Sequence, residues 1–194
     1  MRTPTHAIRI LLLAVALVTP TAAHAKSARN SRKPDVFASL KAGQWIRIEG
    51  VLLKDRRVQC TELKVLTGDF LDDDWTLTGQ IDEVDARTRS LSIGPISIKV
   101  AEDATIEGLN GRTQSFAAIR RGMIVEVDGT YLKDRTFLAM DVDDESDEIT
   151  SPRGEQHLRV VGKIDTADPG RRRVQAMGLT FILSDDTQMK SVIR

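Results

Sequence analysis

The sequence contains a segment that occurs twice at one constant spacing. Residues 40–63 align without a gap with residues 119–142, an offset of 119 minus 40, or 79 positions. Under this offset the run Leu-Lys-Asp-Arg at residues 53–56 recurs at residues 132–135. Because internal repeats report whole supersecondary units, this spacing constrains the fold more strongly than local propensity does.

A second pattern repeats at a different spacing. The opening Gly-x-Ile-Asp-x-x-Asp begins at Gly79 and again at Gly162, an offset of 162 minus 79, or 83 positions. This offset also aligns Asp82 with Asp165. The chain therefore alternates two kinds of unit: a short helix with a hairpin comes first, three strands follow, and the same pair then recurs.

Alternation of apolar and polar residues predicts strands in both kinds of unit. The middle of the chain, residues 75–143, reads as three strands, a short helix and two strands, which is the element order of the OB-fold, a five-stranded β-barrel. We therefore expect an all-β protein built from OB-like five-stranded barrels with one short helix each, in tandem or pseudo-duplicated. The expected strands are 45–49, 58–61, 75–81, 90–93, 96–100, 124–127 and 137–142, with three more within 158–183, and the expected helix of the middle unit is 115–121.

The two outer units are each half of such a barrel. Residues 35–66 supply a helix and a hairpin, and residues 158–194 supply three strands, with the acidic linker 144–157 before them. Since two or three strands alone are marginally stable in water, we expect the halves to pair and close a second barrel. One larger continuous sheet is the alternative.

The motifs resemble those of a known family. The Gly-x-Ile-Asp-x-x-Asp opening, the later Gly122 and the pattern Val-x-Val-x-Gly at residues 125–129, in tandem units behind an export signal, are similar to the secreted bacterial domain of unknown function 5666. The resemblance covers the middle unit fully and the outer halves in part. It implies an OB-like barrel and export, and it brings no established activity.

The N-terminus has the pattern of a cleaved signal peptide. Arg2 and Arg9 precede an apolar run at residues 10–18, and Ala23-His24-Ala25 forms a small-residue end. This pattern predicts residues 1–25 as a signal peptide cleaved after Ala25, and residues 26–34 as a flexible basic leader. We expect a periplasmic or extracellular protein, with no transmembrane segment in the mature chain because no later stretch is apolar enough.

Composition excludes several classes of function. Removal of residues 1–25 leaves 26 basic and 28 acidic residues, and this balance disfavours a nucleic-acid partner. Only Cys60 and His157 remain of their kinds, so we expect no catalytic residues of the Ser/His or Cys/His type. We expect no cofactor, and no zinc or copper site. Cys60 is expected in the core.

Carboxylates leave two alternatives open. The acidic runs at residues 72–74 and 141–148 suit a cation site poorly, since Ser146 stands where an EF-hand loop needs glycine. The repeated Asp82, Asp85, Asp165 and Asp168 are explained by Asx-turns at strand ends. A carboxylate pair for hydrolysis of envelope polymers is the competing interpretation.

The repeated hairpin tips carry the best candidate contacts for a ligand. The corresponding loop of OB-folds often binds ligands, although a hairpin turn with solvated polar residues is the favoured interpretation of the repeated tips. The candidates are Lys54, Asp55, Arg56, Lys133, Asp134 and Arg135 at the tips, with Trp45, Trp75 and Tyr131 as aromatic platforms. The sequence therefore favours an exported, non-catalytic binding module whose partner is an envelope protein or a glycan. A hydrolase and a purely structural scaffold remain alternatives.

Overall fold

The computed structural model describes residues 36–147 and 155–191. The expected signal peptide at 1–25, the leader at 26–34 and residues 148–154 of the expected linker lie outside this part of the chain. All described residues belong to one unit, Pro34–Arg194.

The described residues form strands with three short 3-10 helices, and the expected all-β class is confirmed. The 3-10 helices are η1 (Val36–Ser39), η2 (Phe116–Ala118) and η3 (Pro169–Arg171). The strands are β1 (Trp45–Leu52), β2 (Val58–Val65), β3 (Trp75–Asp85), β4 (Ser90–Ile93), β5 (Ile96–Glu107), β6 (Ile124–Tyr131), β7 (Thr136–Asp144), β8 (His157–Asp168), β9 (Arg173–Ala176), β10 (Leu179–Ile182) and β11 (Gln188–Ser191).

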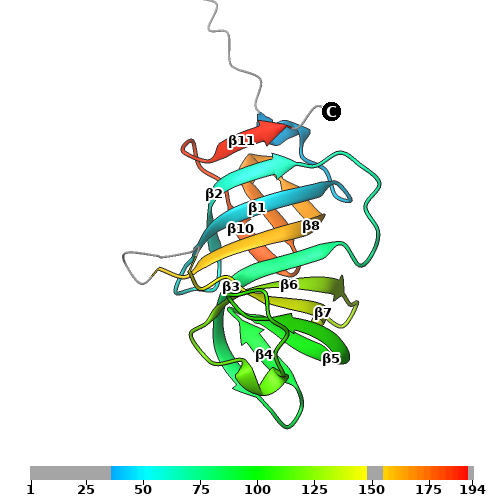
Figure 1. Ribbon diagram of the computed structural model, residues 1–194. Coiled ribbons are helices and arrows are strands. Elements are labelled where there is room, and N and C mark those ends of the chain that lie inside the picture. The colour runs from blue at the N-terminus through cyan, green and yellow to red at the C-terminus, as the bar shows by residue number, and fades with distance from the viewer. Residues whose placement is uncertain (1–35, 148–154, 192–194) are drawn as a thin grey trace, which may run out of the picture. The chain divides into compact units, whose positions relative to one another are not determined.

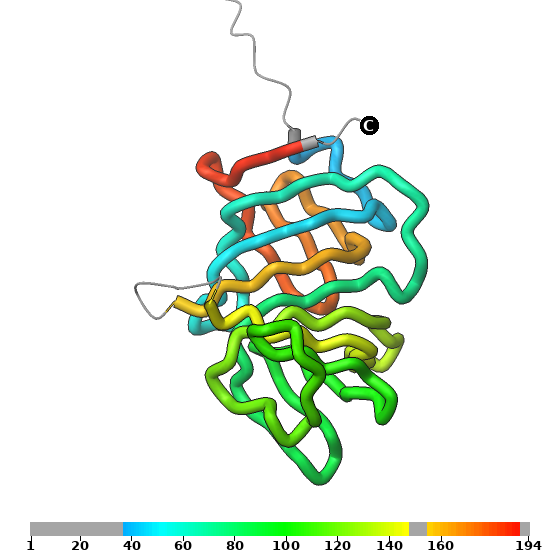
Figure 2. Tube along the Cα trace, viewed as in Figure 1, coloured from blue at the N-terminus to red at the C-terminus, as the bar shows by residue number. Residues whose placement is uncertain are grey.

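The strand pairs close into two rings of five strands each, and Figure 1 labels most of these strands. In the inner ring the order is β3, β4, β5, β7, β6 and back to β3. In the terminal ring the order is β8, β9, β10, β2, β1 and back to β8. Each ring has one parallel contact, β5 with β7 and β10 with β2, and its other contacts are antiparallel. The terminal ring thus joins strands from the two ends of the chain, and Figure 2 shows the blue N-terminal strand beside the orange one.

One antiparallel pair joins the rings. Strand β3 pairs with β8 over residues 76–79, so both rings belong to a single 11-stranded sheet. Strand β11 lies outside both rings and pairs with β2. Closed rings and one continuous sheet therefore coexist, because β3 and β8 each pair with three other strands.

The registers of the two rings follow the offsets of the sequence repeats. Ile98 faces Phe137 across the parallel contact of the inner ring, and Phe181 faces Val58 in the terminal ring. Ile98 and Phe181 are 83 positions apart, and Val58 and Phe137 are 79 positions apart, so the two pairs are equivalent under the two offsets. The β-bulge before Gly50 in β1 recurs at the equivalent place in β6.

Inward-facing apolar side chains fill both rings. Phe137 and Phe181 are fully buried at these parallel contacts. Glycines admit large neighbours: a Cβ added at Gly162 would lie 2.3 Å from the Trp75 ring, and one at Gly79 would lie 2.6 Å from Ile93. Cys60 lies in the same core, as expected.

The structure differs from three local expectations in the extent or number of elements. The helix expected at 115–121 is only η2, because Phe116 and Ile119, three residues apart, bury their side chains with a single 3-10 turn. Strand β5 continues to Glu107 through polar residues, since β7 supplies hydrogen-bonding partners along most of it. Strand β11 was not expected, because four residues with little alternation carry no strand signal on their own.

Candidate functional site

The two repeated tips adopt the same turn. The carboxylate of Asp55 accepts a hydrogen bond from the backbone N–H of Arg57, and that of Asp134 accepts one from Thr136, at 3.1 and 3.0 Å. Arg56 and Arg135 follow in the left-handed region, with φ of 65° and 69°. The aspartates therefore serve the turn, whereas the lysines and arginines of the tips are exposed and available for contacts.

The tip after β6 opens onto a groove with a volume of about 570 Å³. Residues of both rings line it, and we call it the Tyr131 groove. The inner ring contributes Trp75, Tyr131, Leu132, Lys133 and Arg135, while β8, β9 and the turn before β10 contribute Lys163, Ile164, Asp165, Gln175 and Gly178, with Gly43 from the N-terminal segment. Four of the nine candidate contacts thus meet in one cavity: Trp75, Tyr131, Lys133 and Arg135.

A row of four aromatic rings leads to this groove. Ring centroids are 4.8 Å apart between Phe70 and Trp45, 5.4 Å between Trp45 and Trp75, and 5.6 Å between Trp75 and Tyr131. Trp75 is only 7% exposed, so the expectation that it offers an open platform was wrong. It fills the space above Gly162 and supports Tyr131, which is half-buried.

Tyr131 reaches across to the terminal ring. A Cβ at Gly178 would lie 2.8 Å from the Tyr131 hydroxyl, and Gly178 has a φ of 70°. Burial, followed by the charge of Asp165, raises the pKa of Tyr131. The phenol therefore remains protonated at neutral pH and can donate a hydrogen bond at the groove.

Positive charge predominates in the Tyr131 groove. Three cations, Lys133, Arg135 and Lys163, face one carboxylate, Asp165. Lys163 is paired with Asp72 at 2.8 Å and lies over the Trp45 ring. Among the residues that the structure describes, Lys133 and Arg135 take part in no ion pair.

The tip after β1 opens onto a second groove, also of about 570 Å³, which we call the Leu52 groove. Seven of its lining residues occupy positions equivalent to residues of the Tyr131 groove: Leu52, Leu53, Lys54, Arg56, Asp82, Ser92 and Pro95. Leu52 stands in place of Tyr131, and Asp82 and Glu83 balance the charges of Lys54 and Arg56. The two grooves share their frame but differ in chemistry.

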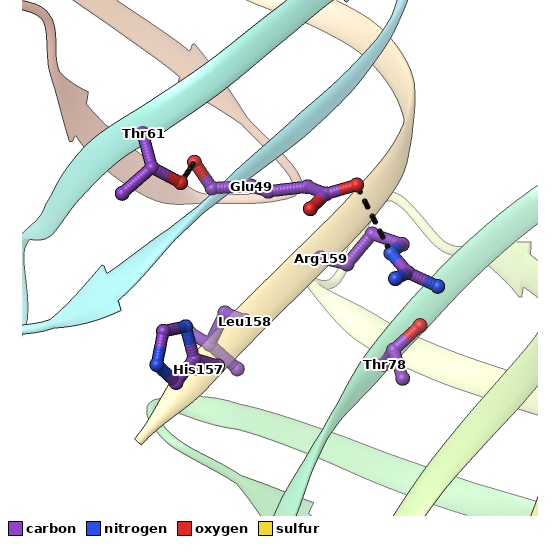
Figure 3. A pocket seen from close by; sticks show the side chains of 6 residues that line it. All are labelled: Glu49, Thr61, Thr78, His157, Leu158 and Arg159. Atoms are coloured by element: carbon purple, nitrogen blue, oxygen red, sulfur yellow. Dashed lines mark hydrogen bonds and ion pairs between the residues drawn. The ribbon is translucent and has the colours of Figure 1, made fainter. Parts of the chain in front are cut away.

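A third cavity lies on the outer face where the rings join, and Figure 3 shows it. Its volume is only about 110 Å³. Glu49 accepts from Arg159 at 3.2 Å and pairs with Arg47, while Arg159 also approaches Glu126. These charges neutralise one another, and the space is large enough for only a few waters. We therefore interpret the side chains around this cavity as a structural ion-pair network and not as a ligand site.

The repeated aspartates accept backbone hydrogen bonds. Asp85 accepts from Arg87 and Thr88, and Asp168 accepts from Arg171. Asp82 accepts from Gly94 at 2.7 Å and Asp165 from Gly178 at 3.3 Å, which ties each strand to the neighbouring turn. Their repetition follows from the architecture of the rings.

Carboxylates of raised pKa lie elsewhere. Burial is the first cause of the raised pKa of both Asp128 and Asp143, and neighbouring carboxylates add to it. Both residues lie on the partly exposed outer face of β6 and β7, and neither lines any of the three cavities described above. The structure therefore offers no cleft with two opposed carboxyls at these positions.

Metal binding, a membrane-spanning helix and thiol chemistry have no support in residues 36–147 and 155–191. No group of three or more His, Cys, Asp or Glu side chains there is arranged to hold a metal ion. No helix in that part of the chain has the length and apolarity to span a membrane. Burial raises the pKa of the Cys60 thiol to about 12, which removes its nucleophilic form at neutral pH.

Five candidate contacts lie apart from the Tyr131 groove. Lys54 and Arg56 line the Leu52 groove, Asp55 and Asp134 hold their turns, and Trp45 lies tilted against Trp75. Sequence reasoning missed Lys163, Gln175 and Phe70. The repeat alignment shows only that Lys163 and Gln175 are equivalent to Gln80 and Ser92, and Phe70 lies in a loop without a repeat equivalent, so the sequence carried no signal that places any of the three at the groove.

Comparison with known proteins identifies one part of the chain. A family model described as Domain of unknown function (DUF5666) matches residues 78–143, which span the inner ring from β3 to β7. No curated protein and no solved structure matches the chain. The family that the sequence motifs resemble is thereby confirmed for this segment: residues 78–143 belong to the domain family of unknown function 5666.

Proposed function

We propose that this protein is an exported, non-catalytic binding module of the cell envelope, and that it holds an envelope protein or a glycan in the Tyr131 groove. The observation that carries the proposal is the meeting of Trp75, Tyr131, Lys133 and Arg135, all chosen from sequence, in one cavity. A concave site with a few convergent polar groups is the usual form of a ligand site.

The proposed architecture is a pair of OB-like barrels that arose by duplication. The inner barrel is continuous in sequence, whereas residues 35–66 and 158–194 complete the second one from opposite ends of the chain. The equivalent registers, bulges and hairpin turns support this interpretation. Deletion of residues 26–66 tests it: amide exchange of β9 and β10 should become fast, because β10 loses β2. Unchanged protection there would contradict the pairing.

The binding site is tested with groove variants of the full mature chain. Immobilised protein is incubated with a washed envelope fraction, and the bound proteins and polysaccharides are quantified. Lys133→Ala with Tyr131→Phe should reduce the retained material about tenfold, because charge-assisted and hydroxyl hydrogen bonds are lost together. Lys54→Ala, at the equivalent position of the Leu52 groove, is the matched control. Equal retention by all three proteins would contradict the proposal.

Export is proposed from the N-terminal pattern and has its own test. Expression of the full chain in a Gram-negative host should yield a periplasmic product that begins at Lys26, as N-terminal sequencing would determine. Replacement of Ala23 and Ala25 by bulky residues should cause the uncleaved precursor to accumulate. An intact N-terminus on the unmodified protein would contradict cleavage.

The two alternatives have less support. A carboxylate-based hydrolase needs opposed acids in a cleft, and Asp82, Asp85, Asp165 and Asp168 instead accept backbone hydrogen bonds at turns. A scaffold without a ligand accounts for the rings, but it gives no role to the cations gathered around Tyr131.

A further inference from the structure

We propose that the Tyr131 groove selects an acidic glycan, a saccharide chain that carries carboxylate or phosphate groups. This inference rests on the binding function proposed above and narrows it to one class of ligand. It depends on the charge of the groove, on its side-chain donors and on the strand pairing in its walls.

The charge balance favours an anion. Lys163 is already paired with Asp72, so Lys133 and Arg135 face Asp165 as the single lining carboxylate, whereas Lys54 and Arg56 of the Leu52 groove face both Asp82 and Glu83. The frame is shared, so the difference lies in the residues that diverged between the repeats. Lys133 and Arg135 are exposed at the tip and have no ion-pair partner among the described residues. An anionic group in the Tyr131 groove could therefore pair with both of them.

The backbone of Arg135 adds to this argument. Its φ of 69° is a conformation that favours glycine or asparagine, yet a guanidinium is placed there at the rim of the groove. Arginine forms bidentate hydrogen bonds with carboxylate and phosphate oxygens. Arg135 thus places a planar donor of hydrogen bonds to anions beside Lys133. Arg56 has the same backbone conformation in the Leu52 groove, where Asp82 and Glu83 balance its charge.

The donors of the groove suit a polyhydroxylated chain. The Tyr131 hydroxyl and the amide of the exposed Gln175 accompany the cations on its walls. The aromatic row behind Tyr131 supplies a rigid support, with Trp75 held against Gly162. Hydroxyl and amide donors near a charged centre fix the orientation of a sugar and its acidic substituent.

A protein strand is the less suitable occupant. Strand addition requires an unpaired edge. Strand β9 pairs with β8 and β10, and β6 pairs with β7 as far as Tyr131 and with β3 as far as Gly129. Only Thr130 and Tyr131 of β6 lack a second strand neighbour, which is too short an edge for an added strand. The walls that β6 and β9 form therefore present mainly side chains to a ligand, and few free backbone N–H and C=O groups. This geometry favours a saccharide over an extended peptide.

The probe is tetragalacturonate, with galactotetraose as its uncharged counterpart and pentamannose phosphate as the phosphate-bearing saccharide. Both tryptophans of the chain belong to the aromatic row, so intrinsic fluorescence and calorimetry can report binding to the mature protein. We expect at least one acidic saccharide to bind about tenfold or more tightly than the neutral chain, and to weaken when NaCl rises from about 0.05 M to about 0.5 M.

Paired variants locate the site. Lys133→Ala with Arg135→Gly should weaken binding of the acidic saccharide about tenfold or more, whereas Lys54→Ala with Arg56→Gly should change it less than about twofold. Glycine preserves the left-handed backbone in both cases, so folding is matched, and unfolding curves verify this. Preference between tetragalacturonate and pentamannose phosphate identifies which acidic group is bound.

Three results would overturn the inference. The first is that neither acidic saccharide binds, the second is that galactotetraose binds as tightly, and the third is that the Lys54 and Arg56 variant loses as much affinity. A hexaglutamate peptide that binds more tightly than both saccharides would identify a protein partner instead. Retention of envelope material through the groove without acidic-saccharide binding would overturn this inference and leave the binding function in place.

Discussion

Leu77 in β3 lies directly opposite Val160 in β8, and the two residues are equivalents under the offset of 83. An antiparallel pair in which equivalent positions face each other has a local two-fold axis between them. The registers beside this pair are equivalent as well, and the tip of each ring lies beside the β-turn of the other and opens onto a groove. The Tyr131 and Leu52 grooves are therefore counterparts produced by one arrangement.

The contact of Gly162 with Trp75 predicts the effect of a single methyl group. Gly162→Ala would place a Cβ 2.3 Å from the indole of Trp75, and overpacking of this kind costs about 1–3 kcal/mol. Urea unfolding should register the loss, and tryptophan fluorescence should shift as Trp75 moves. Gly170→Ala, whose Cβ would meet nothing closer than 3.5 Å, is the control. Equal stability of both variants would refute the assigned packing.

A cation–π contact ties the ends of the chain together. The guanidinium of Arg172 lies 5.6 Å from the centroid of Phe37, and the equivalent Arg89 lies 5.3 Å from that of Phe116. A double-mutant cycle on Arg172→Gly and Phe37→Leu should give a coupling of about 0.5–1 kcal/mol. The cycle on Arg89 and Phe116 serves as the internal comparison. A coupling energy near zero for Arg172 and Phe37, together with the expected coupling energy for Arg89 and Phe116, would show that the Arg172 contact does not stabilise the terminal ring.

The acidic outer face predicts a pH-dependent gain in stability. Burial, then Glu107 and other carboxylates, raises the pKa of Asp143 in the folded protein. A carboxyl whose folded pKa is raised stabilises the fold fully below the unfolded pKa, and this contribution is lost as pH rises through the folded pKa. Asp143→Asn should therefore raise Tm by about 1–3 °C at pH 7, and the gain should vanish below the unfolded value of 3.8.

The control for this prediction is Asp103→Asn, on the exposed part of β5. Its Tm should stay within about 1 °C of the unmodified protein at pH 7. A gain at Asp143 that persists unchanged at pH 3 would attribute the effect to packing and not to charge.

Cys60 predicts a loss of stability at alkaline pH. Burial raises its pKa from 9.0 to about 12, so its contribution is complete below pH 9 and is lost between pH 9 and about 12. Cys60→Ala should remove the contribution of this one titrating group to the pH dependence of the free energy of unfolding. Urea unfolding at pH 8 and 10.5 would measure the difference. The variant should fold, since the equivalent residue in β7 is Ala139. An identical pH slope in both proteins would contradict the assignment.

The sequence by itself determined the all-β class, the family of residues 78–143 and the positions that are equivalent between units. It did so because alternation and repeat spacing are local properties that strands and turns preserve, as in the tips at residues 53–56 and 132–135. Asp82 and Asp165 were explicable as turn residues for the same reason. Their partners Gly94 and Gly178 were not identified, because those bonds cross between strands.

Only the tertiary structure decided which candidates act together. Trp75 and Tyr131 are 56 positions apart, and Gln175 is 44 positions beyond Tyr131, so no local pattern places them in one groove. The pairing of β3 with β6 places Trp75 near Tyr131, and the pairing of β3 with β8 brings the terminal ring with Gln175 to them. The contact with β8 also buries Trp75, which sequence alone left as an open platform. Repeat spacing thus fixed what is equivalent, whereas long-range strand pairing fixed what is adjacent.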